Sequence, residues 1–218
     1  MSARELRGRL VRRAKRAELD LTPELADALQ AYYELLARWN QKINLTSFKL
    51  EEMSDEALDR LLVEPLIAAR HIPVGNRTAI DFGSGGGSPA IPIKLARPEL
   101  RLVMVEAKVR KCAFLREAIR ALNLPDTSVE TARFEDLLPR PELHESFDLG
   151  IMRAVRVEGQ VLRTVQAFLR FGGELFLFRG PSGQLPDPLA PLQWRHTVPL
   201  TEPGRGRLII LEKTAVPA

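Results

Sequence analysis

The most constraining feature of the sequence is a glycine-rich segment that runs from Asp81 to Pro89 and holds four glycines between positions 83 and 87. It follows a short apolar run and precedes a helical pattern. Glycines let the backbone turn tightly and let a ligand approach without a Cβ in the way, while the helix N-terminus offers unpaired N–H groups. We therefore predict a strand–turn–helix unit that binds a nucleotide-like ligand. Ser88 is expected to cap this helix, with Pro89 at its first position.

The rest of the chain beyond Ile72 alternates short apolar runs with helical stretches, which is typical of βαβ units and a parallel sheet. Strands are expected at 78–82, 101–106, 127–131, 147–152, 174–178, 193–199 and 207–213, and helices at 89–96, 108–122 and 157–170. Glycines between the last two strands indicate an antiparallel hairpin. The predicted fold is α/β and Rossmann-like, with a seven-stranded, mostly parallel sheet and an N-terminal helical extension.

The first part of the chain differs in composition. Residues 1–16 hold seven Lys/Arg and one Glu, a charge of +6, so the other 202 residues sum to −2 of the total +4. Such an arm either contacts phosphates or stays solvated. Helices are expected from Thr22-Pro23 and from Ser54, the second interrupted by Pro65. We expect residues 1–72 to form a basic arm and helical cap and residues 73–218 to form the sheet domain, together one structural unit.

The identity of the ligand is narrowed by the residues around the glycines. A dinucleotide and S-adenosylmethionine are both compatible with such a turn. Asp81 would repel a pyrophosphate but attract the cationic methionine end of S-adenosylmethionine, and the third glycine of a dinucleotide fingerprint is replaced by Ser88. We therefore predict S-adenosylmethionine, held by Asp81 and by the turn at Gly83 and Gly85. Glu106, 19 residues after Gly87 (106 − 87), is expected to accept hydrogen bonds from the ribose hydroxyls.

Two further segments are candidates for the ligand crevice. Phe134-Glu135, after the third strand, either contacts the adenine or begins a solvated turn. Arg153, at the end of the fourth strand, is the candidate catalytic residue. It either orients the cofactor or contacts an acceptor phosphate or a guanine edge, or it pairs with a structural acid. The Asn/Asp-Pro-Pro-aromatic motif of many amino-methylating enzymes is replaced here by Met152-Arg153-Ala154. An exocyclic amine is therefore disfavoured as the methyl acceptor, and a ring nitrogen, which needs no deprotonation, is favoured.

Composition bounds the remaining function classes. No apolar run approaches the roughly 20 residues of a membrane span, and the basic start lacks the apolar stretch of a secretory signal. A single cysteine, Cys112, and three scattered histidines predict neither a disulfide nor a metal site, and we expect a cytoplasmic monomer. Eight Lys/Arg against three acids lie in residues 94–120. The candidate RNA contacts are Arg12, Arg13, Lys108, Arg110 and Lys111.

Taken together, several short motifs resemble the GidB-type small-subunit rRNA guanine-N7 methyltransferases. The motifs are Arg38-Trp39-Asn40, Asn44-Leu45-Thr46, Ile80-Asp81-Phe82-Gly83-Ser84-Gly85, Ile91-Pro92, Arg97-Pro98-Glu99, Glu106, Arg110-Lys111, Phe114-Leu115, Arg133-Phe134-Glu135, Arg153-Ala154 and Arg179-Gly180. The resemblance implies a class I methyltransferase that binds S-adenosylmethionine through Gly83, Ser88, Phe134-Glu135 and Arg153, with Glu106 near the ribose. It also implies methyl transfer to guanine N7 in the decoding-region hairpin of 16S rRNA, within the small ribosomal subunit.

The sequence also departs from that family pattern, mainly on the acceptor side. The family has a His and an Asp-Ser pair where this chain has Leu61-Leu62-Val63-Glu64-Pro65, and a Pro-Gly where it has Pro89-Ala90. Two alternatives therefore stay open. One is a methyltransferase of the same fold that acts on another RNA or on a non-RNA substrate, and the other is a non-catalytic nucleotide- or RNA-binding module.

Overall fold

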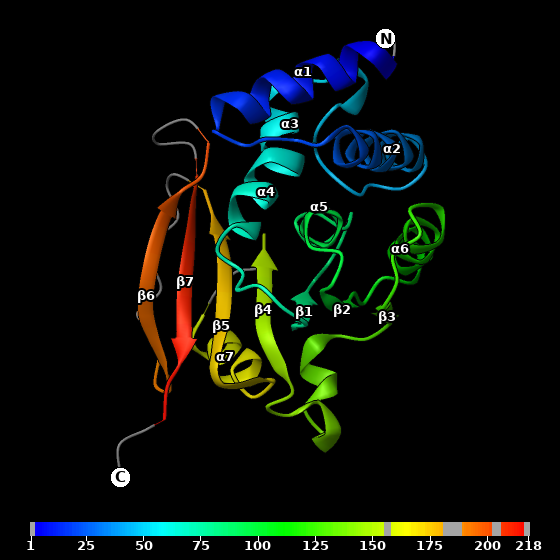
Figure 1. The fold of residues 1–218 in the computed structure, drawn as a ribbon. Helices are drawn as coiled ribbons and strands as arrows, with labels where there is room; N and C mark the ends of the chain where they lie inside the picture. Colours follow the sequence, from blue (N-terminus) through cyan, green and yellow to red (C-terminus); the bar gives the residue numbers. More distant parts are fainter. Residues whose placement is uncertain (1–2, 155–157, 181–188, 202–205, 216–218) are drawn as a thin grey trace.

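The computed structural model describes residues 3–154, 158–180, 189–201 and 206–215, and within them a single seven-stranded sheet in the order β3-β2-β1-β4-β5-β7-β6. The strands are β1 Thr78–Phe82, β2 Arg101–Val105, β3 Thr127–Glu130, β4 Phe147–Arg153, β5 Leu169–Arg179, β6 Leu192–Pro199 and β7 Arg207–Lys213. The first five are parallel, and β7 runs antiparallel to both of its neighbours. The predicted α/β sheet and its C-terminal hairpin are confirmed (Figure 1).

Alternate residues along the strands face two separate hydrophobic clusters, as the pleat of a strand requires. One cluster gathers the N-terminal helices, α5 and α6 on one face of the sheet, and the other gathers α7 and η3 on the opposite face. The helices are α1 Ala3–Arg16, α2 Pro23–Asn40, η1 Leu50–Glu52, α3 Asp55–Leu58, η2 Asp59–Val63, α4 Glu64–Ala69, α5 Ala90–Ala96, α6 Val109–Ala121, η3 Phe134–Leu137, η4 Pro141–Leu143 and α7 Gly159–Val165. Figure 1 shows α1 to α4 gathered above the fanned sheet.

The basic N-terminal segment is a helix with one buried face. Leu6, Leu10 and Ala14 of α1 are buried in the cluster that also contains Ala79 of β1 and Phe176 of β5. The spacing of four residues between these α1 side chains places them on one stripe, which packs on α2 and η2. The first 72 residues thus share a core with the sheet, whereas the boundary at residue 72 stays a prediction.

Three local expectations are wrong. The helix at 89–96 begins after Pro89 without a side-chain cap, because the Ser88 hydroxyl donates to the carbonyl of Leu61 instead. Of the helix expected over 157–170, only Gly159–Val165 is α-helical in the described residues, and this segment is α7. The strand expected at 174–178 begins earlier, at Leu169, because Leu169 already pairs with Phe147. Residue 157 lies outside the described residues.

Pro65 does not interrupt the second helix of the cap. The chain instead passes through a π-helical turn, η2, between α3 and α4. A helix follows Ser54 as expected, and the Ser54 side chain caps it by accepting from the N–H of Ala57. Proline has no N–H to give to a preceding carbonyl, and a wider turn accommodates this loss.

The topology fixes where a ligand can bind. β1 lies between β2 and β4, so the strand order reverses there, and the carboxyl ends of these strands open on the same edge of the sheet. Ligands of open α/β sheets bind in the crevice at such a switch point. The glycine turn follows β1, Glu106 follows β2, and Arg153 ends β4. The fold therefore brings the three principal sequence candidates to one edge.

Candidate active site

A cavity of about 450 Å³ opens at this switch point. One side is formed by Gly83 to Gly86 and Glu106, and the other by residues of the N-terminal cap together with Arg153 and Ala154. The complete lining is Leu36, Leu45, Thr46, Ser47, Phe48, Arg60, Leu61, Gly83, Ser84, Gly85, Gly86, Ser88, Glu106, Lys111, Arg153 and Ala154. The size and the convergence of a few charged groups are those of a small-molecule site.

The glycine turn has a backbone that other residues rarely adopt. Gly83, Gly85 and Gly87 have φ of 78°, 55° and 82°. A Cβ at Gly87 would lie 2.4 Å from the side chain of Ile91, so this glycine also permits α5 to pack closely on the turn. Glycine is therefore required here both by conformation and by space, and the predicted turn is confirmed.

The N-terminal cap holds this turn from above. The hydroxyl of Tyr32 on α2 donates to the carbonyl of Gly86 at 2.7 Å, and a Cβ at Gly86 would lie 3.2 Å from Leu36 and 3.3 Å from the Leu45 carbonyl. Tyr32 is fully buried. Sequence analysis missed this contact because a tyrosine in an amphipathic helix usually indicates core packing alone.

Asp81 lies beneath the turn and does not line the cavity. Its side chain is buried, and its Oδ2 atom has no hydrogen-bond partner among the described residues. Burial raises the pKa of this carboxyl from 3.8 to about 7, against the lowering effects of a hydrogen bond from Ser84 and the charge of Arg153. An acid in this state gains from a nearby cation, which is the property that the sequence analysis required of it.

Glu106 is nearly buried and links the turn to α6. One carboxylate oxygen accepts from the N–H of Gly85 at 2.9 Å, and the other accepts from the N–H of Lys108 at 2.8 Å. Each carboxylate oxygen has a second lone pair, so these bonds leave capacity for hydroxyl donors in the cavity. The position fits the predicted ribose contact, which stays a prediction.

Arg153 reaches the cavity from the end of β4 and is held by several partners. Its guanidinium donates to Glu64 at 2.9 Å, to the Ser88 hydroxyl at 3.3 Å and to the carbonyl of Arg60, and it lies 4.3 Å over the ring of Phe178. Burial lowers the pKa of Arg153 to about 10, while Glu64 opposes that shift. Arg153 thus pairs with a buried acid, which is one of its two predicted roles, and it also lines the cavity. Its contact with the cofactor or a guanine edge stays a prediction.

The two residues expected to contact the adenine, Phe134 and Glu135, lie outside the cavity lining. Phe134 packs edge-on against Phe82, with ring centroids 5.7 Å apart, and Glu135 is exposed in η3. Their contact with the cofactor stays a prediction.

The loop that follows α2 forms the opposite wall of the cavity. The side chain of Asn40 accepts from the N–H groups of Leu45 and Thr46, both at 2.9 Å, and donates to the carbonyl of Phe48 at 3.3 Å. One amide thus folds the whole loop, which explains why Trp39-Asn40 and Asn44-Leu45-Thr46 occur together as a motif. The sequence revealed the motif but not its role.

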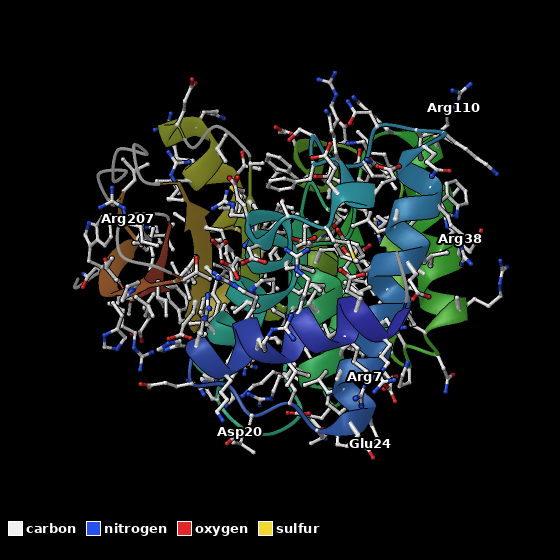
Figure 2. All side chains as sticks on the ribbon, turned by 90° about the horizontal axis from the view of Figure 1, so that it is seen from above. Arg7, Asp20, Glu24, Arg38, Arg110 and Arg207 are labelled. Carbon is white, nitrogen blue, oxygen red and sulfur yellow. The ribbon has the colours of Figure 1, made fainter. Side chains whose placement is uncertain are left out.

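The candidate RNA-binding residues separate into three groups. Lys108 and Arg110 are exposed at the start of α6, and Lys111, one residue further on, lines the cavity. Arg12 is exposed on α1, outside the cavity lining. Figure 2 shows Arg110 and Arg38 at the outer edge of the molecule.

The prediction for Arg13 is wrong. Its guanidinium is buried against both oxygens of Asp59, including a 2.8 Å bond from Nε to Oδ1, and contacts Asp55. The acidic segment that follows α2 therefore neutralises the inner face of α1. In a sequence, an arginine of a basic arm cannot be told from one that pairs with acids 46 residues away.

Among the described residues, no three His, Cys, Asp or Glu side chains lie together as a metal site would need. In the same residues, no helix is long and apolar enough to cross a membrane.

The strand order and the cavity beyond β1, β2 and β4 define a Rossmann-like class I methyltransferase fold. A solved structure described as a SAM-dependent methyltransferase from Aquifex aeolicus is 12% identical, with a TM-score of 0.57 over 75% of this chain and 96% of that chain. A structure of MtNAS in complex with MTA and tNA is 14% identical, with a TM-score of 0.59 over 88% of this chain and 75% of that chain. At these identities the likeness concerns the fold.

The chain belongs to the GidB family, described as rRNA small subunit methyltransferase G, whose sequence model matches residues 25–185. A protein named Ribosomal RNA small subunit methyltransferase G from Chromobacterium violaceum is 32% identical over 190 residues, which are 85% of this chain and 86% of the relative. Its namesake from Dictyoglomus thermophilum is 35% identical over 180 residues, 80% of this chain and 72% of the relative. The predicted resemblance is confirmed, and the chain is a methyltransferase.

Proposed function

We propose that this methyltransferase transfers a methyl group from S-adenosylmethionine to N7 of a guanine in 16S rRNA, in the decoding-region hairpin of the small ribosomal subunit. The observation that carries the proposal is the division of the cavity. Its glycine side suits the cofactor, and its cap side presents the Arg153 guanidinium. Among the lining residues that the structure describes, Glu106 is the only carboxylate, and it already accepts from two N–H groups. We assign its remaining lone pairs to the ribose hydroxyls, and guanine N7 does not need a base.

The residues of the cavity fit S-adenosylmethionine, the cofactor predicted from the sequence and supported by family membership. The buried Asp81 oxygen that has no partner favours a positively charged ligand group, and the three glycines with positive φ leave the turn free of side chains. When bound, S-adenosylmethionine would supply a methyl group on a sulfonium sulfur. Once the methyl group is transferred, this sulfur is left as a neutral thioether. The solved neighbours include MtNAS in complex with S-adenosylmethionine, with a TM-score of 0.56 and 15% identity over 86% of this chain and 72% of that chain.

On the acceptor side, the chain positions a base and does not activate it. An arginine is well suited to the O6 and N7 edge of guanine, and a donor from Arg153 to O6 leaves the N7 lone pair free for in-line attack. Phe48 and Leu61 give this side an apolar surface, suited to a flat base, beside the hydroxyls of Thr46 and Ser47. Catalysis then comes chiefly from proximity and orientation.

RNA contact is assigned to the cations near the cavity mouth. Lys111 points its ammonium toward the turn, since a Cβ at Gly85 would lie 3.9 Å from Nζ, and Lys108 and Arg110 extend the same surface outward. Exposed cations of this kind bind the phosphate backbone and make affinity depend on salt. Arg12 is retained as a more distant contact, whereas Arg13 is not, because its charge is neutralised.

The test is methyl transfer from labelled S-adenosylmethionine to small subunits and to 16S rRNA isolated from cells that lack the chain. Borohydride and aniline cleave RNA at 7-methylguanosine, and we expect one new cleavage in the decoding-region hairpin. Incorporation at another RNA position would move the proposal to a different acceptor. Incorporation into protein, or none into RNA, would refute it and favour a non-RNA acceptor on the same fold.

A further inference from the structure

A buried acid that the mechanism above does not use contacts two arginines of the cavity lining. Glu64, at the start of α4, has no exposed surface, and its carboxylate lies 2.9 Å from Arg153 and 3.4 Å from Arg60. Burial raises the pKa of Glu64, and the two arginines oppose that shift. Glu64 does not line the cavity, but Arg153 and Arg60 both do. Its effect on a ligand must therefore pass through those arginines.

The position of Arg153 follows from the local sequence. Pro65 stands four residues after Leu61 and five after Arg60, so it has no N–H for either carbonyl in a helical register. The structure gives these two oxygens other donors: the Ser88 hydroxyl bonds to the Leu61 carbonyl at 2.8 Å, and Arg153 donates to the Arg60 carbonyl. The π-helical turn and the carboxylate that follows it thus form a receptor for one guanidinium.

The receptor also balances the positive charge of the guanidinium in the cavity. The cofactor carries a sulfonium cation, and methylation of N7 moves that positive charge onto the base. A guanidinium in the same small cavity would repel both cations unless its charge were balanced nearby. Asp81 also attracts Arg153, but more weakly than Glu64 does. Glu64 is in direct contact with the guanidinium.

We propose that Glu64 is a positioning residue that fixes Arg153 and neutralises its charge, so that the cavity accepts a cationic sulfonium. This inference deepens the proposed function and rests on it for the identity of the cofactor, though not for the RNA acceptor. Arg153 can then offer directed hydrogen bonds to the base without opposing the positive charge of the donor. Removal of Glu64 would leave a buried cation without its counter-ion.

The test compares two ligands that differ in charge at sulfur: S-adenosylmethionine, a cation, and S-adenosylhomocysteine, a neutral thioether. Calorimetry measures both affinities for the wild type, Glu64→Gln, Arg153→Gln and the double variant. Glu64→Gln keeps the shape and loses the charge. We expect it to weaken S-adenosylmethionine about tenfold, as one unbalanced charge at several Å would do, and S-adenosylhomocysteine less than threefold. In the Arg153→Gln background, Glu64→Gln should change the affinity for S-adenosylhomocysteine by less than twofold. It should weaken S-adenosylmethionine by much less than tenfold, since only the longer contact with Arg60 then remains.

Controls separate this role from a structural one. Glu174→Gln makes the same change at an acid that pairs with Arg195 at 2.6 Å on the β5 and β6 strands, outside the cavity lining, and should leave the ratio of affinities unchanged. Glu64→Asp, which keeps the charge, should stay closer to the wild-type ratio than Glu64→Gln. If Glu64→Gln does not fold, the double variant is compared with Arg153→Gln instead. The two should then differ little in their ratio of affinities, and a large difference overturns the proposal.

The proposal is overturned if both ligands weaken equally in Glu64→Gln, or if the loss for S-adenosylmethionine persists in the Arg153→Gln background. It is also overturned if Glu64→Asp shifts the ratio of affinities as far as Glu64→Gln does, or if the double variant favours the neutral ligand over the cation as strongly as Glu64→Gln. These affinities are measured without RNA, so the inference can fail while the assignment of the RNA acceptor stands, and the reverse.

Discussion

Replacement of Asp81 by asparagine tests how the cavity recognises a cation. The carboxyl is buried with a pKa of about 7, so at pH 7 about half of the molecules carry it protonated. A cation bound nearby favours the ionised form. If binding lowers the pKa by about two units, S-adenosylmethionine should release about 0.5 proton per molecule at pH 7. Affinity should then be about tenfold higher at pH 8 than at pH 6, since the ionised fraction of the free protein rises from about 0.09 to about 0.9.

The same substitution should affect stability in the opposite sense. The folded-state pKa lies above the value of 3.8 expected for the unfolded chain, so the folded state binds more protons between pH 4 and 7 and this carboxyl costs stability as pH rises through that range. Above pH 7 the cost is at most about 4 kcal/mol, three pKa units at 1.36 kcal/mol each. Asp81→Asn should therefore unfold at higher denaturant concentration than the wild type at pH 8 but bind S-adenosylmethionine more weakly.

The assay is calorimetry at pH 6, 7 and 8 in buffers of different ionisation heats, which gives the number of protons released, together with urea unfolding at pH 5 and pH 8. Asp81→Asn lacks the titrating carboxyl, so its affinity for S-adenosylmethionine should not rise from pH 6 to pH 8, and binding should not release the corresponding proton. The reasoning is refuted if wild-type affinity is independent of pH, or if Asp81→Asn keeps the wild-type slope.

Three other substitutions test the site. Gly87→Ala should lower the free energy of unfolding by about 1–3 kcal/mol, since it combines positive φ with a severe contact, whereas Gly180→Ala, with nothing within 4 Å, should be nearly neutral in urea titrations. Tyr32→Phe should weaken S-adenosylmethionine severalfold in calorimetry because the turn loses its donor, while Tyr33→Phe, whose hydroxyl bonds the Leu50 carbonyl, should not; equal losses would contradict this. Lys111→Gln should weaken RNA binding and reduce the salt slope by about one unit in filter-binding assays, and an unchanged slope would remove it from the interface.

The sheet could be predicted from sequence because its signals are local. Apolar runs marked the strands, and the glycines with a preceding carboxylate marked the switch point. The helix expected over 157–170 is wrong at its end because Leu169 pairs with Phe147 of β4, a contact between distant segments that periodicity does not report.

The cap side of the cavity was harder to predict for the same reason. Glu64 and Tyr32 act on a side chain and a turn that the fold alone brings near them, and nothing in their local patterns indicates a partner. The partners of Asn40 lie within the same motif, but the motif does not indicate which groups bond to each other. Pro65 was a visible signal, but it was interpreted as a break in the helix rather than as a source of free carbonyls. Arg13 shows the converse case, in which a charged run contains one residue that is buried and paired.

The central claim is that this chain methylates guanine N7 in the small-subunit decoding-region hairpin. The test is borohydride–aniline mapping of 16S rRNA from three kinds of cells: cells that lack the chain, and the same cells carrying either the wild-type gene or the Arg153→Gln variant. The account predicts that cleavage at one guanine disappears in the deletion and returns with the wild type but not with the variant. Cleavage that persists in the deletion would contradict it.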